Sequence, residues 1–188
     1  FSAVKGGGAF RNGEPIHVAD IPLENALVAF GTAPYYQELK DATFAVAKEL
    51  GVRCGDLRRS GSAAVDLCHL AAGQLDGFFE LRLSPWDYAA STVILQEAGA
   101  VTGTAPGQAF TFEEKQPFLA GTPGVYPPLE ALAGKYLAQL YYKTHRGTAG
   151  VFCGPAGPAL HAGRRPTAAP PSYCTPPASR TPSSVLTA

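Results

Sequence analysis

A carboxylate opens one of the helices predicted from this sequence. Asp87 follows Ser84, Pro85 and Trp86, in the first turn of a helix expected to run to about Ala98. A carboxylate is a hard oxygen ligand that suits Mg²⁺. The spacing Ser84-x-x-Asp87 is also that of a capping box, and the helix dipole favours an acid in a first turn. The residues alone favour the capping role, and the two roles can coexist.

A second predicted helix begins beside residues that could bind hydroxyl or phosphate oxygens. Gly61, Ser62 and Ala63 stand at its start, where the first backbone N–H groups have no partner within the helix and can donate to a ligand. An ordinary helix capped by Ser62 explains the same residues nearly as well. Glu80 ends a predicted strand over 77–80, and the residues alone favour an exposed acid there.

The other polar candidates carry weaker signals. Trp86 is expected to pack in the core beneath the site, and Arg58 and Arg59 to form a solvated pair at a strand end. His69 lies within an apolar helix and is expected to be a core histidine. No Ser-His-Asp or Cys-His arrangement stands out, so the sequence predicts no nucleophile of these kinds.

Short apolar runs alternate with helical periodicity along most of the chain. Asn12-Gly13 predicts a hairpin turn between strands over 8–11 and 16–18. Pro34 is expected to open a helix, where its missing N–H costs nothing. The remaining strands are predicted at 27–30, 52–57, 77–80, 100–102 and 118–120, and the helices at 34–51, 63–72, 84–98 and 126–142. This alternation predicts an α/β layer architecture with a largely parallel sheet.

Charge and composition divide the chain. Residues 1–130 hold nine Lys and Arg and all 15 acids, whereas residues 131–188 hold six Lys and Arg and no acid. Near the C-terminus the helical pattern stops and Gly, Pro, Ala, Ser and Thr dominate. Such a segment cannot bury enough apolar surface to offset its ordering entropy. We therefore expect a domain over 1–142 and a disordered tail over 143–188.

The composition also bears on partners and compartment. The formal net charge is zero, which gives no reason to expect a nucleic-acid or membrane partner. No apolar run reaches the roughly 18 residues of a membrane span. The four cysteines have no CxxC spacing, and Cys54 and Cys68 lie in apolar segments. Free buried thiols are therefore expected, together with a reducing cytoplasm.

Several segments, taken in order, resemble motifs of the inositol monophosphatase family. They are the glycine-rich hairpin, the Arg-x-x-Gly-Ser-Ala-Ala segment, the strand that follows it, and Trp-Asp-x-Ala with a later Glu-Ala-Gly-Gly. The matching residues are 3–13, 58–68, 72–80, 84–91 and 97–100. Ser91 and Ala100 stand where the family usually has Gly. The resemblance covers about residues 1–140, and the chain is similar to the C-terminal half of that family's proteins.

The resemblance implies a fold, a cofactor and a site. The fold is the C-terminal half of the layered αβαβα sandwich of the inositol monophosphatase and fructose-1,6-bisphosphatase type. The Asp of Trp-Asp ligates Mg²⁺ in the family, which makes Asp87 the expected metal ligand. The positions that match Gly61, Ser62, Ala63 and Glu80 line the substrate site or bind substrate hydroxyls. A small phosphate monoester and a homodimer are the implied partners.

The resemblance also implies that part of the site lies elsewhere. The family's other magnesium ligands come from a Glu-Glu pair and an Asp-Pro-(Ile/Leu)-Asp-Gly-(Thr/Ser) loop, both upstream of the hairpin that here begins at Phe1. We expect neither motif in this chain, and hence a fragment without catalytic residues that is inactive alone. We also expect uncovered apolar surface and marginal stability.

The expected activity of the parent protein is Mg²⁺-dependent hydrolysis of an inositol phosphate. Within the same family, the alternatives are 3′(2′),5′-bisphosphate nucleotidase and fructose-1,6-bisphosphatase activity. A non-catalytic pseudoenzyme or dimerisation module is the alternative outside catalysis.

Overall fold

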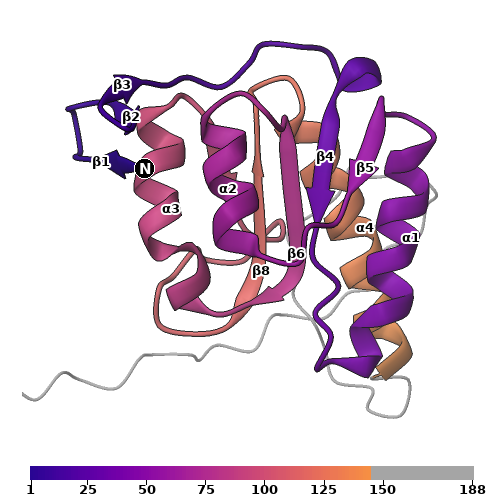
Figure 1. Cartoon of the computed structure of the whole chain (residues 1–188). Coiled ribbons are helices and arrows are strands. Elements are labelled where there is room, and N and C mark those ends of the chain that lie inside the picture. Colours follow the sequence, from indigo (N-terminus) through magenta and orange to yellow (C-terminus); the bar gives the residue numbers. More distant parts are fainter. Residues whose placement is uncertain (145–188) are drawn as a thin grey trace, which may run out of the picture. The chain divides into compact units, whose positions relative to one another are not determined.

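The computed structural model describes residues 1–144, which contain two β-sheets (Figure 1). The smaller sheet has the strand order β1-β2-β3 and consists of β1 (Ser2–Ala3), β2 (Ala9–Arg11) and β3 (Glu14–Pro15). The larger sheet has the order β5-β4-β6-β8-β7 and consists of β4 (Leu27–Phe30), β5 (Asp56–Arg58), β6 (Gly77–Leu83), β7 (Val101–Gly103) and β8 (Gln116–Gly121). The tail predicted from residue 143 lies outside the described residues, apart from its first two residues.

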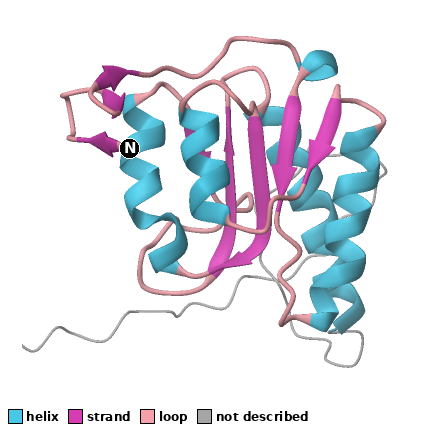
Figure 2. Ribbon diagram, viewed as in Figure 1, coloured by secondary structure: helices cyan, strands magenta, loops and turns pink. Residues whose placement is uncertain are grey.

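Helices cover both faces of the larger sheet (Figure 2). The described helices are α1 (Lys40–Gly51), α2 (Ala63–Ala71), α3 (Pro85–Glu97) and α4 (Tyr126–Thr144), with 3-10 turns η1 (Leu23–Asn25) and η2 (Gln37–Leu39). α1 and α4 pack on one face, and α2 and α3 on the other. Within residues 1–144, no helix combines the length and the apolar character that crossing a bilayer requires.

The predicted α/β architecture is confirmed, and β8 is the strand that departs from a parallel sheet. β4 pairs in parallel with both β5 and β6, whereas β8 is antiparallel to both β6 and β7. Four of the five strands therefore run in the same direction. Since parallel strands end at a common edge of a sheet, the segments that follow β4, β5 and β6 all start at one edge, here named the carboxyl edge.

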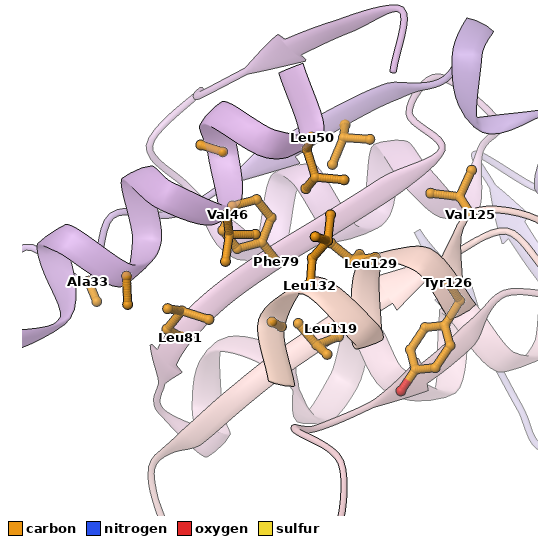
Figure 3. Packing of buried hydrophobic residues seen from close by; sticks show 14 of the residues in the cluster. Ala33, Val46, Leu50, Phe79, Leu81, Leu119, Val125, Tyr126, Leu129 and Leu132 are labelled. Atoms are coloured by element: carbon orange, nitrogen blue, oxygen red, sulfur yellow. The ribbon is translucent and has the colours of Figure 1, made fainter. Parts of the chain in front are cut away.

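Alternation along β6 divides the core between the two faces of the sheet. Successive side chains of a strand point to opposite faces, and Phe78 and Phe79 are both fully buried, in different clusters. Figure 3 shows the cluster around Phe79, in which Leu50 of α1 and Leu129 and Leu132 of α4 meet the sheet. Burying a side chain of this size contributes about 1.5–3 kcal/mol relative to leaving it exposed.

Local signals placed most elements within a few residues, with two clear differences. The Asn12-Gly13 hairpin forms, but its second strand is β3 (Glu14–Pro15) rather than 16–18. Pro34 does not open a helix: it is exposed, and α1 begins only at Lys40, after η2. The reason is a tertiary contact. The N–H of Ala33 donates to a carboxylate of β6, and this contact holds the segment after β4 in a turn.

The end of α3 holds the glycine-rich segment between β1 and β2. The Glu97 carboxylate accepts hydrogen bonds from the N–H of Gly6 at 2.7 Å and the N–H of Gly8 at 2.9 Å. Both glycines have positive φ, 76° and 84°, a conformation that costs little without a Cβ atom. Two residues 89 or more positions away in sequence are thereby joined to one carboxylate, which ties the smaller sheet to α3.

This anchor predicts a pH-dependent contribution to stability. The N–H of Gly6, followed by that of Gly8, lowers the pKa of Glu97 from its ordinary value. A carboxyl group whose pKa is lower in the folded state stabilises the fold above its unfolded pKa, and that contribution disappears as the pH falls through the folded pKa. We expect Glu97→Gln to lower the melting temperature at neutral pH, and the difference from wild type to vanish in acid.

Amide chemical shifts of Gly6 and Gly8, followed by NMR from neutral pH into acid, would test the same contact. In the wild type both should titrate with Glu97, and in Glu97→Gln neither should. Glu24→Gln, which removes an exposed acid in η1, is the matched control. The assignment would be contradicted if the amides of Gly6 and Gly8 in Glu97→Gln titrated as they do in the wild type.

Candidate functional site

The predicted site residues lie at the carboxyl edge of the larger sheet. The segment 31–39 follows β4, the segment 59–62 joins β5 to α2, and Ser84 joins β6 to α3 (Figure 1). In open α/β sheets, ligands bind in the crevice outside the carboxyl ends of the strands. The topology therefore brings three separate stretches of sequence to the edge at which a ligand site is expected.

A pocket of about 80 Å³ opens among these segments. It is lined by residues from 30–34 after β4, by residues from 59–63 around the start of α2, and by Asp66, Phe78 and Glu80. Enclosed sites for small molecules usually have about 300–1,000 Å³. The described residues thus form part of the wall of a site rather than a closed cavity.

Glu80 is the buried acid of this pocket. It lies in the middle of β6, with 9% of its surface exposed, so the expectation from the residues alone of an exposed acid at a strand end is wrong. Its Oε1 accepts the N–H of Ala33 at 3.0 Å. A Cβ atom on Gly31 would lie 2.0 Å from its Oε2, so any other residue at position 31 would displace this carboxylate from its present place.

The surroundings of Glu80 favour its protonated form. Burial raises the pKa of Glu80, and the N–H of Ala33 opposes that shift. The negative charges of Asp87 and Asp66 raise this pKa further, and Arg59 lowers it. Three carboxylates and one guanidinium therefore share the electrostatics of this region. A buried carboxyl with a raised pKa can act as a hydrogen-bond donor as well as an acceptor.

The start of α2 brings polar groups to the pocket. Ser62 is the N-cap residue, but its hydroxyl makes no capping hydrogen bond, so the interpretation as an ordinary Ser-capped helix is wrong. The N–H of Ser62 donates to the Ser60 hydroxyl at 3.2 Å, and the N–H of Asp66 donates to the Ser62 carbonyl at 3.0 Å. The N–H groups of Ala63, Ala64 and Val65 lie between these two. They point toward the start of the helix at the carboxyl edge, as helix geometry requires.

Asp87 lies in the first turn of α3, half-buried and outside the lining of the pocket. The capping box predicted with Ser84 does not form, because the Ser84 side chain makes no capping hydrogen bond. Within residues 1–144, the Asp87 carboxylate has no hydrogen-bond or ion-pair partner. Its negative charge is one of the causes that raise the pKa of Glu80, after burial.

Tyr88 fixes the start of α3 and so the position of Asp87. Its ring is fully buried and stacks on Phe118 with 4.7 Å between centroids. Its hydroxyl donates to the Thr111 carbonyl at 2.8 Å and accepts from Gln116 Nε2 at 2.8 Å. Removing such a buried hydrogen-bond partner costs about 1–3 kcal/mol, so the first turn of α3 is held firmly.

Two sequence expectations around the site are corrected by the fold. Trp86 is 77% exposed and does not pack in the core; it precedes Asp87 at the surface end of α3, where no other described element covers it. Arg58 and Arg59 are both exposed, as expected of a solvated pair. Arg58 forms an ion pair with Asp56, and Arg59 also lines the pocket, where its Nη2 donates to Thr32 Oγ1 at 3.3 Å. His69 is half-buried rather than a core residue.

Sequence reasoning missed Asp66 and the segment 31–34. Asp66 is 4% exposed and lines the pocket from α2. Its position, three residues after Ala63, places it on the same helix face as the predicted site, a signal that the sequence did contain. The segment 31–34 carries no motif of its own, since its role comes from its contact with Glu80.

The described residues do not form a complete magnesium site. Within 1–144, no group of three or more His, Cys, Asp or Glu side chains is placed to hold a metal ion. Mg²⁺ requires six oxygen ligands in near-octahedral geometry, and Asp87 can supply one of them. The expectation that no Glu-Glu pair occurs is wrong as stated, because Glu113 and Glu114 are adjacent. Both are exposed in the segment before β8.

A family model matches most of the chain, and curated relatives match half of it or more. The model of a family described as "Inositol monophosphatase family" matches residues 1–143. The chain is 43% identical over 102 residues to "Nus factor SuhB" of Vibrio cholerae. This match covers 54% of the chain and 38% of the relative. The chain is also 35% identical over 127 residues to "Inositol-1-monophosphatase" of Bacillus subtilis. That match covers 67% of the chain and 48% of the relative.

A solved structure shares the fold. The inositol monophosphatase from Anabaena superposes with a TM-score of 0.61 at 32% identity, covering 73% of this chain and 53% of that chain. The chain thus spans less than half the length of these two curated relatives, and about half that of the solved structure.

The contact between Gly31 and Glu80 predicts a non-additive effect on stability. Gly31→Ala places a methyl group against the Glu80 carboxylate, and we expect a loss of about 1–3 kcal/mol, as for other overpacked sites. In a Glu80→Ala background the same substitution should cost clearly less, because the clashing group is gone. Chemical denaturation of the four proteins of this cycle measures the coupling.

Gly124→Ala is the control, because its added Cβ would meet its nearest neighbour at an ordinary 3.7 Å. Equal costs of Gly31→Ala in both backgrounds would show that Glu80 does not pack against Gly31.

Proposed function

Because the chain belongs to the inositol monophosphatase family, we propose that it forms the substrate-binding part of a Mg²⁺-dependent phosphomonoesterase. The proposed substrate is an inositol phosphate or a related sugar or nucleotide phosphate. One observation carries this proposal. Gly61, Ser62, Ala63 and Glu80, from separate parts of the sequence, line one pocket at the carboxyl edge of the sheet.

Each part of the site has a role suited to its chemistry. Glu80, buried and able to accept or donate, binds substrate hydroxyls. The first N–H groups of α2 donate to hydroxyl or phosphate oxygens beside Gly61 and Ser62. Asp87, whose carboxylate has no partner among residues 1–144, supplies one magnesium ligand. When bound, Mg²⁺ polarises a phosphoryl oxygen and lowers the pKa of bound water.

The chain by itself is proposed to be inactive. One described carboxylate cannot hold hexacoordinate magnesium, and no catalytic residue is assigned in this chain. The remaining ligands would come from a part of the parent protein that this chain does not contain. The shares of the Vibrio cholerae and Bacillus subtilis relatives that the chain covers, 38% and 48%, support this division.

Inositol monophosphate is preferred as the substrate because a polyol ring suits the positions of Ser62 and Glu80. A bisphosphorylated nucleotide or fructose 1,6-bisphosphate is the alternative within the same family. A reducing cytoplasm and a homodimer are also proposed: Cys54 and Cys68 are free thiols, and the dimer is implied by the family alone.

A second candidate function is non-catalytic. The 43% identity to a relative named "Nus factor SuhB" favours a role in binding a partner rather than in catalysis. The same site variants separate the two candidates, since a binding role does not require the Asp87 carboxylate.

A chimaera tests the proposed function. The part of Bacillus subtilis inositol-1-monophosphatase that precedes its match to this chain would be joined to Phe1, and phosphate release from inositol monophosphate would be measured with and without Mg²⁺. We expect Mg²⁺-dependent turnover by the chimaera and none by the chain alone. Asp87→Asn should lower kcat by about 100-fold or more, because even outer partners of metal ligands cost 10–100-fold.

Glu80→Gln should raise KM for inositol monophosphate more than it lowers kcat, as expected of a hydroxyl-binding residue. Glu24→Gln, far from the carboxyl edge, is the control. Full activity of the Asp87→Asn chimaera would refute the assignment of Asp87, and turnover by the isolated chain would refute its inactivity. If the Asp87→Asn chimaera still replaces the SuhB protein of Vibrio cholerae in that organism, the non-catalytic candidate gains support.

A further inference from the structure

Asp66 on α2 is a buried carboxylate with no partner in the described part of the chain. It has 4% of its surface exposed and lines the pocket that contains Glu80. Its backbone N–H donates to the Ser62 carbonyl, but its carboxylate has no hydrogen-bond or ion-pair partner among residues 1–144. Burying a charged group without a partner is costly, so this carboxylate is expected to meet a ligand or water in the pocket.

The oxygens of Asp66 are open to solvent rather than sealed in the core. Among the described side chains, the oxygens that are both fully enclosed and without a partner belong to Thr43, Thr104 and Thr122. The Asp66 carboxylate is not one of these, although it also lacks a partner, so it faces open space. That space is the pocket beside Glu80 and a neighbouring hollow of about 240 Å³, which Asp66 also lines.

Asp66 and Glu80 approach the pocket from different elements. Asp66 follows Ala63 by three residues, which puts both on one face of α2, and both line the pocket. Glu80 follows Phe78 by two residues in the regular part of β6, so it points to the same face of the sheet, where Phe78 packs in the core with α2. The pocket measures only about 80 Å³, so a group bound in it lies near both carboxylates.

The charge of this pocket favours a neutral hydrogen-bond donor. Arg59 lines the pocket, but its guanidinium donates to Thr32 Oγ1 at 3.3 Å and makes no ion pair with Asp66. A phosphate group is negatively charged, so the Asp66 carboxylate would repel it. A metal ion is disfavoured as well, because no group of three or more suitable side chains within residues 1–144 is placed to hold one.

Asp66 has more free acceptor capacity than Glu80. Oε1 of Glu80 already accepts the N–H of Ala33, and its Oε2 lies against Gly31. Both oxygens of Asp66 are free among residues 1–144. An ionised carboxylate only accepts hydrogen bonds, and a hydroxyl group that donates to it makes a short, strong one. A polyol hydroxyl therefore suits Asp66 by both charge and hydrogen-bonding chemistry.

We propose that Asp66 binds a second hydroxyl group of the substrate, next to the hydroxyl that Glu80 binds. This inference rests on the proposed function and narrows its substrate class to phosphate esters of polyols with two neighbouring free hydroxyl groups. Asp66 is then a specificity residue, because an ester that lacks the second hydroxyl would leave its carboxylate buried without a partner.

Ligand binding to the complete 188-residue chain tests this role without requiring activity. Inositol 1-phosphate and a series of analogues, each lacking one ring hydroxyl, would be titrated while the amide signals of Gly61, Ser62 and Ala63 are followed by NMR. We expect two neighbouring ring positions at which loss of the hydroxyl weakens binding about tenfold, as for a hydrogen bond to a charged group.

The same titrations on variants assign each hydroxyl to its carboxylate. In Asp66→Asn, loss of one of the two hydroxyls should no longer weaken binding, and in Glu80→Gln the other should behave in this way, as in a double-mutant cycle. Asp20→Asn is the control, because Asp20 is exposed, precedes β4 and does not line the pocket. Unchanged discrimination by Asp66→Asn, or coupling of both variants to one hydroxyl, would overturn the inference.

Two further measurements can contradict the role of Asp66. Asp66→Asn should melt no lower than the wild type, since it removes a buried charge without a partner. A clearly lower melting temperature would show a partner within the fold and overturn the inference. Mg²⁺ alone should leave the ¹³C carboxyl signal of Asp66, assigned by its loss in Asp66→Asn, unshifted at millimolar concentration. A shift would make Asp66 an ion ligand instead.

These outcomes separate the inference from the function on which it rests. If Glu80→Gln shows coupling to a ring hydroxyl and Asp66→Asn shows none, the role of Asp66 is wrong and the proposed function stands. If inositol 1-phosphate does not bind the chain at millimolar concentration, the inference is overturned, and phosphate release by the chimaera decides the proposed function by itself.

Discussion

The buried carboxylate of Glu80 is the constraint on which the carboxyl edge depends. A carboxyl group with 9% of its surface exposed needs hydrogen-bond partners, and the N–H of Ala33 supplies one. That bond holds the chain after β4 in a turn, and a Cβ atom at position 31 would displace the carboxylate from its present place. The same turn precedes α1, which begins only at Lys40, and the ring centroid of Tyr36 lies 5.3 Å from the Arg82 guanidinium. One buried carboxyl group of β6 thus sets the course of the segment that follows β4.

The strand order explains why so many segments meet at this edge. β4, β5 and β6 run parallel to one another, so all three end at this edge. The segment that follows each of them contributes to the site. β8 runs the opposite way, so it begins at this edge and brings Lys115 with it. An entirely parallel sheet would place the start of that strand at the far edge. The reversed strand therefore adds a basic side chain to this edge.

The charges at this edge fall into two groups around Glu80. Asp66 and Asp87 place negative charge on the side of α2 and α3, and Arg82 and Lys115 place positive charge on the side of Tyr36.

The sequence by itself determined the elements and the family, because both are recorded in local patterns. The hairpin at Asn12-Gly13, the small-residue helix after Ser62 and the helix after Ser84 each follow from a few neighbouring residues. Only the tertiary structure decided that Glu80 is buried, that Trp86 is exposed, and that Arg59 rather than Arg58 lines the pocket. Burial depends on which elements pack over a residue, and its neighbours in sequence do not encode that. The pairing of Tyr36 with Lys115, 79 residues apart, is visible only once the strand order is known.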